Sequence, residues 1–232
     1  MKEIFDNYIE TSFDDFRQAE FKFDQFEFNY RKYFPTDLSA SVLDIGIGRG
    51  EMLSCMKKWG YQNYLGVDIS KSTVSFCSGL DLRCDLVDDV RPWLIDRPES
   101  FSIITLLDVL EHFDKKEVVP FLKAVRSALG DGGIVIIQVP NLQSPDGFLH
   151  RYNDITHEIG FLEHSLRQIL IESGFRKFSF HGFEVNIYPG IKNNLDKFIR
   201  AIYWRFVHYK RRITTNLDPP ILHPVLFAVA RK

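Results

Sequence analysis

The sequence predicts an α/β fold in which a largely parallel β-sheet is covered by helices on both faces. From residue 41 onward, short apolar segments of strand length alternate with amphipathic segments of helix length. Alternation at this spacing implies right-handed crossover connections, which place helices over both faces of a parallel sheet. A second observation is the glycine-rich turn directly after the first strand, which is typical of nucleotide-binding α/β folds.

Seven strands and four helices are expected within this alternation. The strands are predicted at residues 41–45, 64–67, 82–86, 101–107, 134–139, 175–185 and 221–230. The helices are predicted at residues 50–59, 70–77, 116–129 and 163–173. Gly60 and Gly174 follow the first and the last of these helices, where a left-handed residue commonly ends a helix.

Residues 1–38 are predicted to form a helical N-terminal cap ahead of one Rossmann-like domain at residues 39–232. Apolar residues recur at helical spacing in two stretches, which predicts two helices, and Pro35 ends the second. The spacing is defined by Ile9, Phe13 and Phe16 in the first stretch and by Phe23, Phe26, Tyr30 and Tyr33 in the second. The two helices either bury this stripe against the core or cover the active site.

The composition is that of an ordinary soluble globular protein, with 45% hydrophobic and 26% charged residues in 232. The net charge of −2 gives no overall attraction to nucleic acid. The three cysteines are odd in number and lack metal-ligand spacing, which favours a reducing compartment. Because the N-terminus is polar and acidic and not a signal peptide, we expect a cytoplasmic protein.

The glycine-rich turn has the sequence Asp44-Ile45-Gly46-Ile47-Gly48-Arg49-Gly50. Its glycines let the backbone turn sharply and let a ligand approach where a Cβ would clash. A dinucleotide-binding loop has its third glycine where this chain has Glu51, and that carboxylate would repel a pyrophosphate. S-adenosylmethionine has no phosphate and carries two cationic groups, which suit Asp44 at the strand tip. We therefore predict S-adenosylmethionine as the cofactor.

Two further carboxylates lie at the carboxyl ends of the next two strands. Asp68 ends the second strand, where a carboxylate can accept hydrogen bonds from both ribose hydroxyls. Asp85 lies at the end of the third strand, placed to accept from an adenine amino group. A tight turn among unrelated surface acids would not explain why each acid lies at a strand's carboxyl end.

These motifs resemble those of class I S-adenosylmethionine-dependent methyltransferases. The similarity covers about residues 40–185 and includes the stretch Leu107-Asp108-Val109-Leu110-Glu111-His112-Phe113. It implies a doubly wound, mostly parallel seven-stranded sheet whose last strand is antiparallel. It places cofactor contacts at Asp44, Gly46, Gly48, Gly50, Asp68, Ile69, Asp85, Leu86, Asp108 and Val109. In the resembled fold, Asp85 and Leu86 lie beside the adenine, and residues 107–109 line the methionine end.

Two histidines and one aspartate are the candidates for the transfer itself. A hydroxyl acceptor needs a base in addition to alignment with the methyl group. His157, in the loop after the fifth strand, is the preferred base or acceptor-positioning residue; alternatively, it pins the loop through Asp154. His112 follows the fourth strand and is interpreted mainly as a support for the site, because this stretch recurs in the resembled family with different substrates.

No metal site is expected. Asp108, Asp154, His157 and Glu158 could together form an oxygen-rich site. Their spacing does not support one, so the sequence predicts catalysis without a bound metal.

A basic helical insert is predicted at residues 190–214, before the last strand. One helical face carries Leu195, Phe198, Ile199, Ile202 and Phe206. The basic residues are Lys192, Lys197, Arg200, Arg205, Lys210, Arg211 and Arg212, against Asp196 alone. Three interpretations of the insert are open. Its basic side chains form a solvated outer face over a packed stripe, or they dock a phosphorylated or lipid-linked acceptor or an anionic membrane surface. The third interpretation is a nucleic-acid patch. No RNA-binding module is visible, so we expect no nucleic-acid partner.

The acceptor is indicated by a second resemblance. The loop at residues 154–161, the basic insert and the segment 217–232 look similar to methyltransferases associated with bacterial surface-polysaccharide biosynthesis. That similarity implies O-methylation of a sugar hydroxyl in a surface glycan or its precursor. The alternatives are a small-molecule O-methyltransferase of the ubiquinone or secondary-metabolite type and a non-catalytic, cofactor-binding partner subunit. The intact glycine turn and Asp68 argue against the last.

Overall fold

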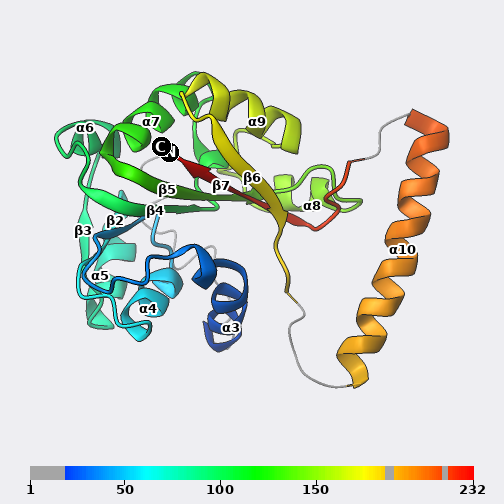
Figure 1. The fold of residues 1–232 in the computed structure, drawn as a ribbon, viewed down its shortest axis with the longest axis horizontal. Helices are drawn as coiled ribbons and strands as arrows, with labels where there is room; N and C mark the ends of the chain where they lie inside the picture. Colours follow the sequence, from blue (N-terminus) through cyan, green and yellow to red (C-terminus); the bar gives the residue numbers. More distant parts are fainter. Residues whose placement is uncertain (1–18, 186–190, 216–218) are drawn as a thin grey trace.

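The computed structural model describes residues 19–185, 191–215 and 219–232 and contains one seven-stranded sheet (Figure 1). The strands are β1 (Val42–Ile45), β2 (Tyr64–Asp68), β3 (Cys84–Leu86), β4 (Phe101–Leu107), β5 (Leu129–Pro140), β6 (Lys177–Gly182) and β7 (Val225–Arg231). Their order in the sheet is β3-β2-β1-β4-β5-β7-β6. Strands β1 to β5 pair in parallel, whereas β7 runs antiparallel to both neighbours, β5 and β6. The predicted sheet, with its antiparallel last strand, is confirmed.

Helices cover both faces of the sheet (Figure 1). One face carries α3 (Ala19–Tyr30), α4 (Glu51–Lys58) and α5 (Lys71–Gly79). The other carries α6 (Val90–Ile95), α7 (Lys115–Ala128) and α9 (Glu163–Glu172). The remaining elements are the 3-10 turns η2 (Arg31–Tyr33) and η3 (Leu110–His112), the short α8 (Gly147–Tyr152) and the long α10 (Ile191–Thr215).

The central strands are apolar on both faces because each face packs under helices. In β4, Ile104 and Leu106 belong to the core under α7 and α9, whereas Ile103 belongs to the core under α3 and α4. Neighbouring residues of a strand point to opposite faces, so one apolar run supplies both cores. These two cores hold the carboxyl ends of the strands, and with them the loops that follow.

Some boundaries and two short helices differ from the prediction. β6 spans fewer residues than the predicted 175–185, and β7 begins at Val225 and not at residue 221. Helices α6 and α8 were not predicted, because six residues are too few to show an apolar period. The available signal for α6 was Asp89, whose side chain accepts a hydrogen bond from the Arg91 amide at 3.0 Å and so caps the helix.

The N-terminal lead-in is described only in part. Its first predicted helix, marked by Ile9, Phe13 and Phe16, lies outside the described residues. The second corresponds to α3 followed by η2, and its Phe26 and Tyr30 are buried against the sheet. The aromatic stripe of α3 therefore belongs to the core, while the division of the chain at residue 38 stays a prediction.

Helix α10 covers the predicted insert, but its apolar stripe does not pack against the protein. Leu195, Phe198, Ile199, Ile202 and Phe206 are each at least 55% exposed. The interpretation of this stripe as a packed one is therefore wrong. The sequence period predicts which residues share a helix face, and it does not predict which face meets the rest of the molecule. Among the described residues, no helix is both long and apolar enough to cross a membrane.

Candidate active site

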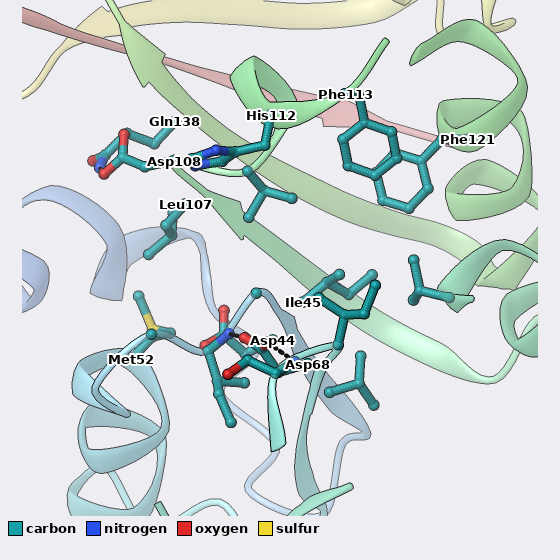
Figure 2. Close-up of a pocket in the computed structure, with 18 of the residues that line it drawn as sticks. Asp44, Ile45, Met52, Asp68, Leu107, Asp108, His112, Phe113, Phe121 and Gln138 are labelled. Atoms are coloured by element: carbon teal, nitrogen blue, oxygen red, sulfur yellow. Dashed lines mark hydrogen bonds between the residues drawn. The ribbon is translucent and has the colours of Figure 1, made fainter. Parts of the chain in front are cut away.

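A cavity of about 740 Å³ opens at the carboxyl ends of β1, β2 and β4 (Figure 2). Open α/β sheets bind their ligands at this edge. The lining comes from residues 44–48, 51–52, 67–70, 87–91, 107–109 and 112–114, with further residues from α3, α7 and the β6–β7 side. Of the predicted cofactor contacts, the lining includes Asp44, Gly46, Gly48, Asp68, Ile69, Asp108 and Val109.

Both the backbone conformation and the close packing of neighbouring side chains require glycine in this turn. Gly46, Gly48 and Gly50 all have positive φ angles, of 75°, 51° and 77°. A Cβ on Gly46 would lie 2.5 Å from Cγ2 of Val109, so only glycine fits there. Gly50 does not line the cavity, and a Cβ on it would lie 2.5 Å from Leu82. Gly50 thus serves helix packing, and its predicted cofactor contact stays a prediction.

Asp44 is a fully buried carboxyl group at the end of β1. The Thr105 hydroxyl donates a hydrogen bond to its Oδ1 at 2.5 Å. Burial raises the pKa of Asp44 to about 8, and the charges of Glu51 and Asp68 add to the increase. A carboxyl group in this position ionises readily only when a cation enters the cavity.

Asp68 joins the end of β2 to the glycine turn (Figure 2). Its Oδ2 accepts from the Ile47 amide at 3.0 Å, and its Oδ1 accepts from the Ser70 amide at 2.8 Å. A carboxylate oxygen can accept more than one hydrogen bond, and Asp68 lines the cavity. That arrangement fits the adjacent hydroxyls of a ribose.

The predicted adenine contacts Asp85 and Leu86 are exposed and lie outside the lining. The next segment, residues 87–91, forms this part of the wall. In register, Asp85 pairs with Val67, one position before the strand end that meets the cavity. A shift of one or two residues along a strand moves a side chain to another face or past the edge.

The cavity is strongly acidic. Its described lining carries one guanidinium, Arg91, and eight carboxyl groups, those of Asp44, Glu51, Asp68, Asp88, Asp89, Asp108, Asp114 and Glu117. Arg91 is already paired with Glu117, at 2.6 Å. Such a cavity attracts a cation and repels a pyrophosphate, as predicted from Glu51.

Asp108 is held at the opposite wall by a chain of hydrogen bonds that starts in α3. The Tyr30 hydroxyl donates to Oε1 of Gln138, and Nε2 of Gln138 donates to Oδ2 of Asp108 at 2.7 Å. Figure 2 shows Gln138, Asp108 and the His112 ring on this wall, facing Asp44 and Asp68. Gln138 lies inside a continuous apolar strand, and that polar interruption was the signal the sequence offered for it.

His112 is the histidine that lines the cavity. Its Nδ1 lies 2.8 Å from the hydroxyl of Thr156, which donates to Oδ1 of Asp154 at 2.6 Å. A hydroxyl has one proton, so Thr156 accepts from Nδ1–H, and neutral His112 carries its lone pair on Nε2. Burial, followed by the nearby charge of His157, lowers the pKa of His112 to about 4.

His157, the preferred base from the sequence, is not among the lining residues. Its ring packs edge-on against His112, with ring centroids 4.8 Å apart, and its Nδ1 lies 3.0 Å from the carbonyl oxygen of His150. The side chain of Asp154, expected to pin His157, reaches His112 through Thr156 instead. The structure therefore favours the reverse of the predicted ranking of the two histidines.

Thr156 was missed from the sequence. It is buried, and its amide donates to the Asp154 carboxylate at 2.9 Å in a tight turn. The spacing of an aspartate two residues before a threonine is typical of such turns, and it was the available signal. The loop is docked on η3 because the amides of Glu158 and Ile159 donate to the carbonyl oxygen of Glu111, at 2.7 and 3.1 Å.

Together, the sheet order, the glycine turn and the acidic cavity define an α/β enzyme for a cationic nucleoside cofactor. A family described as "Methyltransferase domain" matches residues 16–179, and the chain belongs to this family. No curated protein matches the chain. The protein is an S-adenosylmethionine-dependent methyltransferase, with that cofactor as its methyl donor.

Several solved structures share the fold. A SAM-dependent methyltransferase from Archaeoglobus fulgidus is 25% identical, covers 94% of this chain and 100% of its own, and has a TM-score of 0.69. One from Mesorhizobium loti is 16% identical, with coverage of 90% and 100% and a TM-score of 0.59. Phosphoethanolamine N-methyltransferase 2 from Haemonchus contortus, in complex with S-adenosyl-L-methionine, is 16% identical, with coverage of 98% and 60% and a TM-score of 0.60.

Proposed function

We propose that this protein methylates a sugar hydroxyl in a bacterial surface glycan or in its precursor. The observation that carries the proposal is the hydrogen-bonded chain Asp154–Thr156–His112, which ends at the cavity wall. A base oriented by a second group is the arrangement that activates a hydroxyl for attack. An alcohol needs such activation much more than an amine does, because a neutral amine already has a nucleophilic lone pair.

In the proposed reaction, S-adenosylmethionine supplies a methyl group on a sulfonium sulfur. The acceptor oxygen forms the new C–O bond while the C–S bond breaks and its electron pair stays on sulfur. His112 takes the hydroxyl proton on Nε2, because its Nδ1 already donates to Thr156. Asp154 and Thr156 hold the ring in this orientation, and His157 supports it from behind.

The wall that would meet the acceptor is uncharged. Phe26 of α3 and Phe183 after β6 contact each other edge to face, with ring centroids 6.1 Å apart, and both line the cavity. Aromatic rings can pack against the C–H face of a sugar ring. Any phosphate of a nucleotide-linked or lipid-linked acceptor would have to stay outside, because the cavity itself is acidic.

The same aromatic wall would also accept a small phenol, so an O-methyltransferase of the ubiquinone or secondary-metabolite type is the alternative. A screen separates the two. The protein is incubated with methyl-labelled cofactor and with nucleotide sugars, polyprenyl-linked sugars, polysaccharide fragments and catechols, and products are located by mass spectrometry. A methoxy group on a sugar is expected. Methylation of the catechols alone would overturn the proposal, as would methylation on nitrogen.

A non-catalytic role makes a different prediction in the same screen. A partner subunit would bind the cofactor and produce no S-adenosylhomocysteine with any acceptor. The variant Asp68→Ala, which removes a proposed ribose contact, gives the background rate for comparison.

A further inference from the structure

Glu111, in η3, is a buried carboxyl group without a hydrogen-bond partner. Glu111 is 1% exposed, and neither of its carboxylate oxygens has a hydrogen-bond partner among the described residues. A buried polar group in this state destabilises the protein unless something binds it. The carboxyl group does not reach the solvent, so a ligand for it has to lie inside the protein.

Two imidazoles lie beside this carboxyl group. Glu111, His112 and His157 each offer a ligand atom, and these three atoms lie within 4.8 Å of one another. Two atoms bound to one ion at about 2.0–2.2 Å lie at most about 4.4 Å apart, so small side-chain adjustments would bring the three onto one ion. The backbone bonds from Glu158 and Ile159 to Glu111 keep the loop and η3 in this arrangement.

Both rings are also hydrogen-bonded through Nδ1. Nδ1 of His112 bonds to Thr156, and Nδ1 of His157 bonds to the carbonyl oxygen of His150. Metal-binding histidines typically donate one ring N–H to a carbonyl, a carboxylate or a similar acceptor, which orients the other nitrogen toward the ion.

We propose that Glu111, His112 and His157 bind a divalent transition-metal ion. Two imidazole nitrogens and one carboxylate oxygen form a ligand set that suits Zn²⁺, Mn²⁺ and Co²⁺ better than Mg²⁺. This set differs from the oxygen-rich one considered from the sequence, because Glu111 replaces Asp108, Asp154 and Glu158. Three protein ligands leave coordination positions open, and of the three residues His112 lines the cavity.

The role of the ion rests on the proposed function. A hydroxyl that coordinates an ion loses its proton more easily, so the proton passes to solvent and the oxygen attacks the methyl group. When the ion is bound, the imidazoles act as ligands and the ion, in place of His112, activates the hydroxyl; the chain Asp154–Thr156–His112 then orients a ligand.

Metal binding is tested without any acceptor. Chelator-stripped protein is titrated calorimetrically with ZnCl₂, MnCl₂ and MgCl₂, and Co²⁺ is followed by its visible spectrum. One Zn²⁺ or Mn²⁺ per chain is expected, and Glu111→Gln should weaken binding by about tenfold or more. Glu158→Gln, which changes an exposed carboxylate on the same loop, should bind as the unchanged protein does. Glu111→Gln is close in size to the native residue, and its melting temperature, measured alongside, checks that the variant is folded.

Absence of stoichiometric binding, or equal binding by Glu111→Gln, would overturn the metal site. The acceptor screen, run with and without chelator, separates this outcome from failure of the proposed function. Sugar methylation that continues unchanged in chelator removes the metal's role and leaves the sugar assignment intact. Stoichiometric metal binding without any methylated sugar would leave the metal site intact and remove the sugar assignment.

An independent observation concerns α10, which stands beside the sheet at the β6–β7 edge (Figure 1). One side of the helix meets the protein: Arg200 pairs with Glu184 at 2.9 Å, Trp204 packs on His223, and Val207 is buried. At 100° per residue these positions lie opposite the apolar stripe. That stripe, extended by Tyr209 and Ile213, is 55–67% exposed along its whole length.

The charges of α10 complement a negatively charged surface. The helix has seven Lys and Arg residues and one acid, a net charge of +6, so the rest of the chain carries −8 of the total of −2. Exposed Arg205 and Arg212 flank the stripe on one side, and exposed Lys210 flanks it on the other. An apolar stripe between basic rows is the pattern of a helix that lies in a membrane interface.

We infer that α10 binds the surface of an anionic lipid bilayer through this stripe. A second copy of the helix would bring like charges together along both flanks, whereas anionic lipids neutralise them. The position also suits a lipid-linked acceptor, because Glu184, the partner of Arg200, lies between two residues that line the cavity, Phe183 and Val185.

Vesicle flotation tests this surface. The protein should float with vesicles of phosphatidylcholine and phosphatidylglycerol and stay unbound with phosphatidylcholine alone. Binding should weaken by about tenfold or more in Phe198→Ser/Ile202→Ser/Phe206→Ser, and also in Arg205→Gln/Lys210→Gln/Arg212→Gln. Because these side chains are exposed, both variants should keep the melting temperature.

Two outcomes would overturn the inference. One is equal flotation of the stripe variant and the unchanged protein, or no flotation of either. The other is a dimer in solution that the stripe variant converts to a monomer, since the stripe would then be covered by a second copy.

Discussion

The hydroxyl of Thr156 lies 2.8 Å from Nδ1 of His112 and connects that ring to the carboxylate of Asp154. The contact bridges two loops that follow different strands, β4 and β5. Because Thr156 can donate only once, its bond to Asp154 decides which nitrogen of His112 carries the proton. A residue outside the cavity thus sets the chemical state of one that lines it.

Thr156→Val should therefore reduce the methylation rate by about 10–100-fold while leaving cofactor affinity unchanged, because the ring loses its orienting partner. Thr156→Ser keeps the hydroxyl and should retain most of the rate. The measurement is turnover to S-adenosylhomocysteine, with cofactor affinity from calorimetry. If Thr156→Val and Thr156→Ser have equal rates, the hydroxyl has no such role.

Cofactor binding should depend on pH through Asp44. Burial raises its pKa to about 8 in the free protein, so below pH 8 the cationic cofactor has to displace a proton. Affinity for S-adenosylmethionine should rise toward pH 8, by at most about tenfold per pH unit, and calorimetry in buffers of different ionisation enthalpy should detect proton release.

The stability of the free protein should show the opposite trend. A carboxyl group with a raised folded-state pKa contributes stability that is present below its unfolded pKa and lost as the pH rises through about 8. Asp44→Asn, which cannot ionise, should flatten both profiles between about pH 4 and pH 8. A pH-dependent affinity that survives in Asp44→Asn would assign the proton to another group.

Asp68→Ala should weaken binding of S-adenosylmethionine and S-adenosylhomocysteine by about 1.5–3 kcal/mol, the usual range for hydrogen bonds to a charged group. Asp85→Ala is the matched control, because Asp85 is exposed and outside the lining, and its affinity should not change. NAD should not bind to either protein. Equal losses in the two variants would return Asp85 to the cofactor site.

Tyr30→Phe should lower the free energy of unfolding by about 1–3 kcal/mol, since it leaves the buried Oε1 of Gln138 without its donor. Each kcal/mol corresponds to about 2–4 °C in melting temperature for a domain of this size. Tyr33→Phe, which removes a partly exposed hydroxyl 3.2 Å from His181, should cost about 0.5 kcal/mol or less. Similar melting temperatures for the two variants would show that the Tyr30–Gln138 bond contributes little.

The parts of the site that follow from local backbone were predictable from the sequence. Gly46 and Gly48 need positive φ angles, and Asp44 and Asp68 lie at strand ends, so composition and order along the chain are enough to locate them. Gly50 was placed in the right turn, yet the reason for it is a neighbour, Leu82, that the turn itself does not reveal.

The other half of the site depends on contacts between distant segments. Gln138 meets Asp108 across two strands, and His157 meets His112 only because a loop docks on η3. Glu111 was visible in the sequence beside His112, but its complete burial was not. For α10, the period predicted the helix and its stripe correctly, and the direction of the stripe came from three contacts that no period encodes.

The place of β7 in the sheet has a consequence for the order in which the protein can fold. Among the strands of this sheet β7 is synthesised last, and it lies between β5 and β6, which are joined only through it. Every nascent chain therefore passes through a stage in which β5 exposes one unpaired edge and β6 exposes two. Unpaired edges invite pairing with other chains, so interrupting synthesis before Val225 should produce aggregation-prone fragments and not a smaller working enzyme.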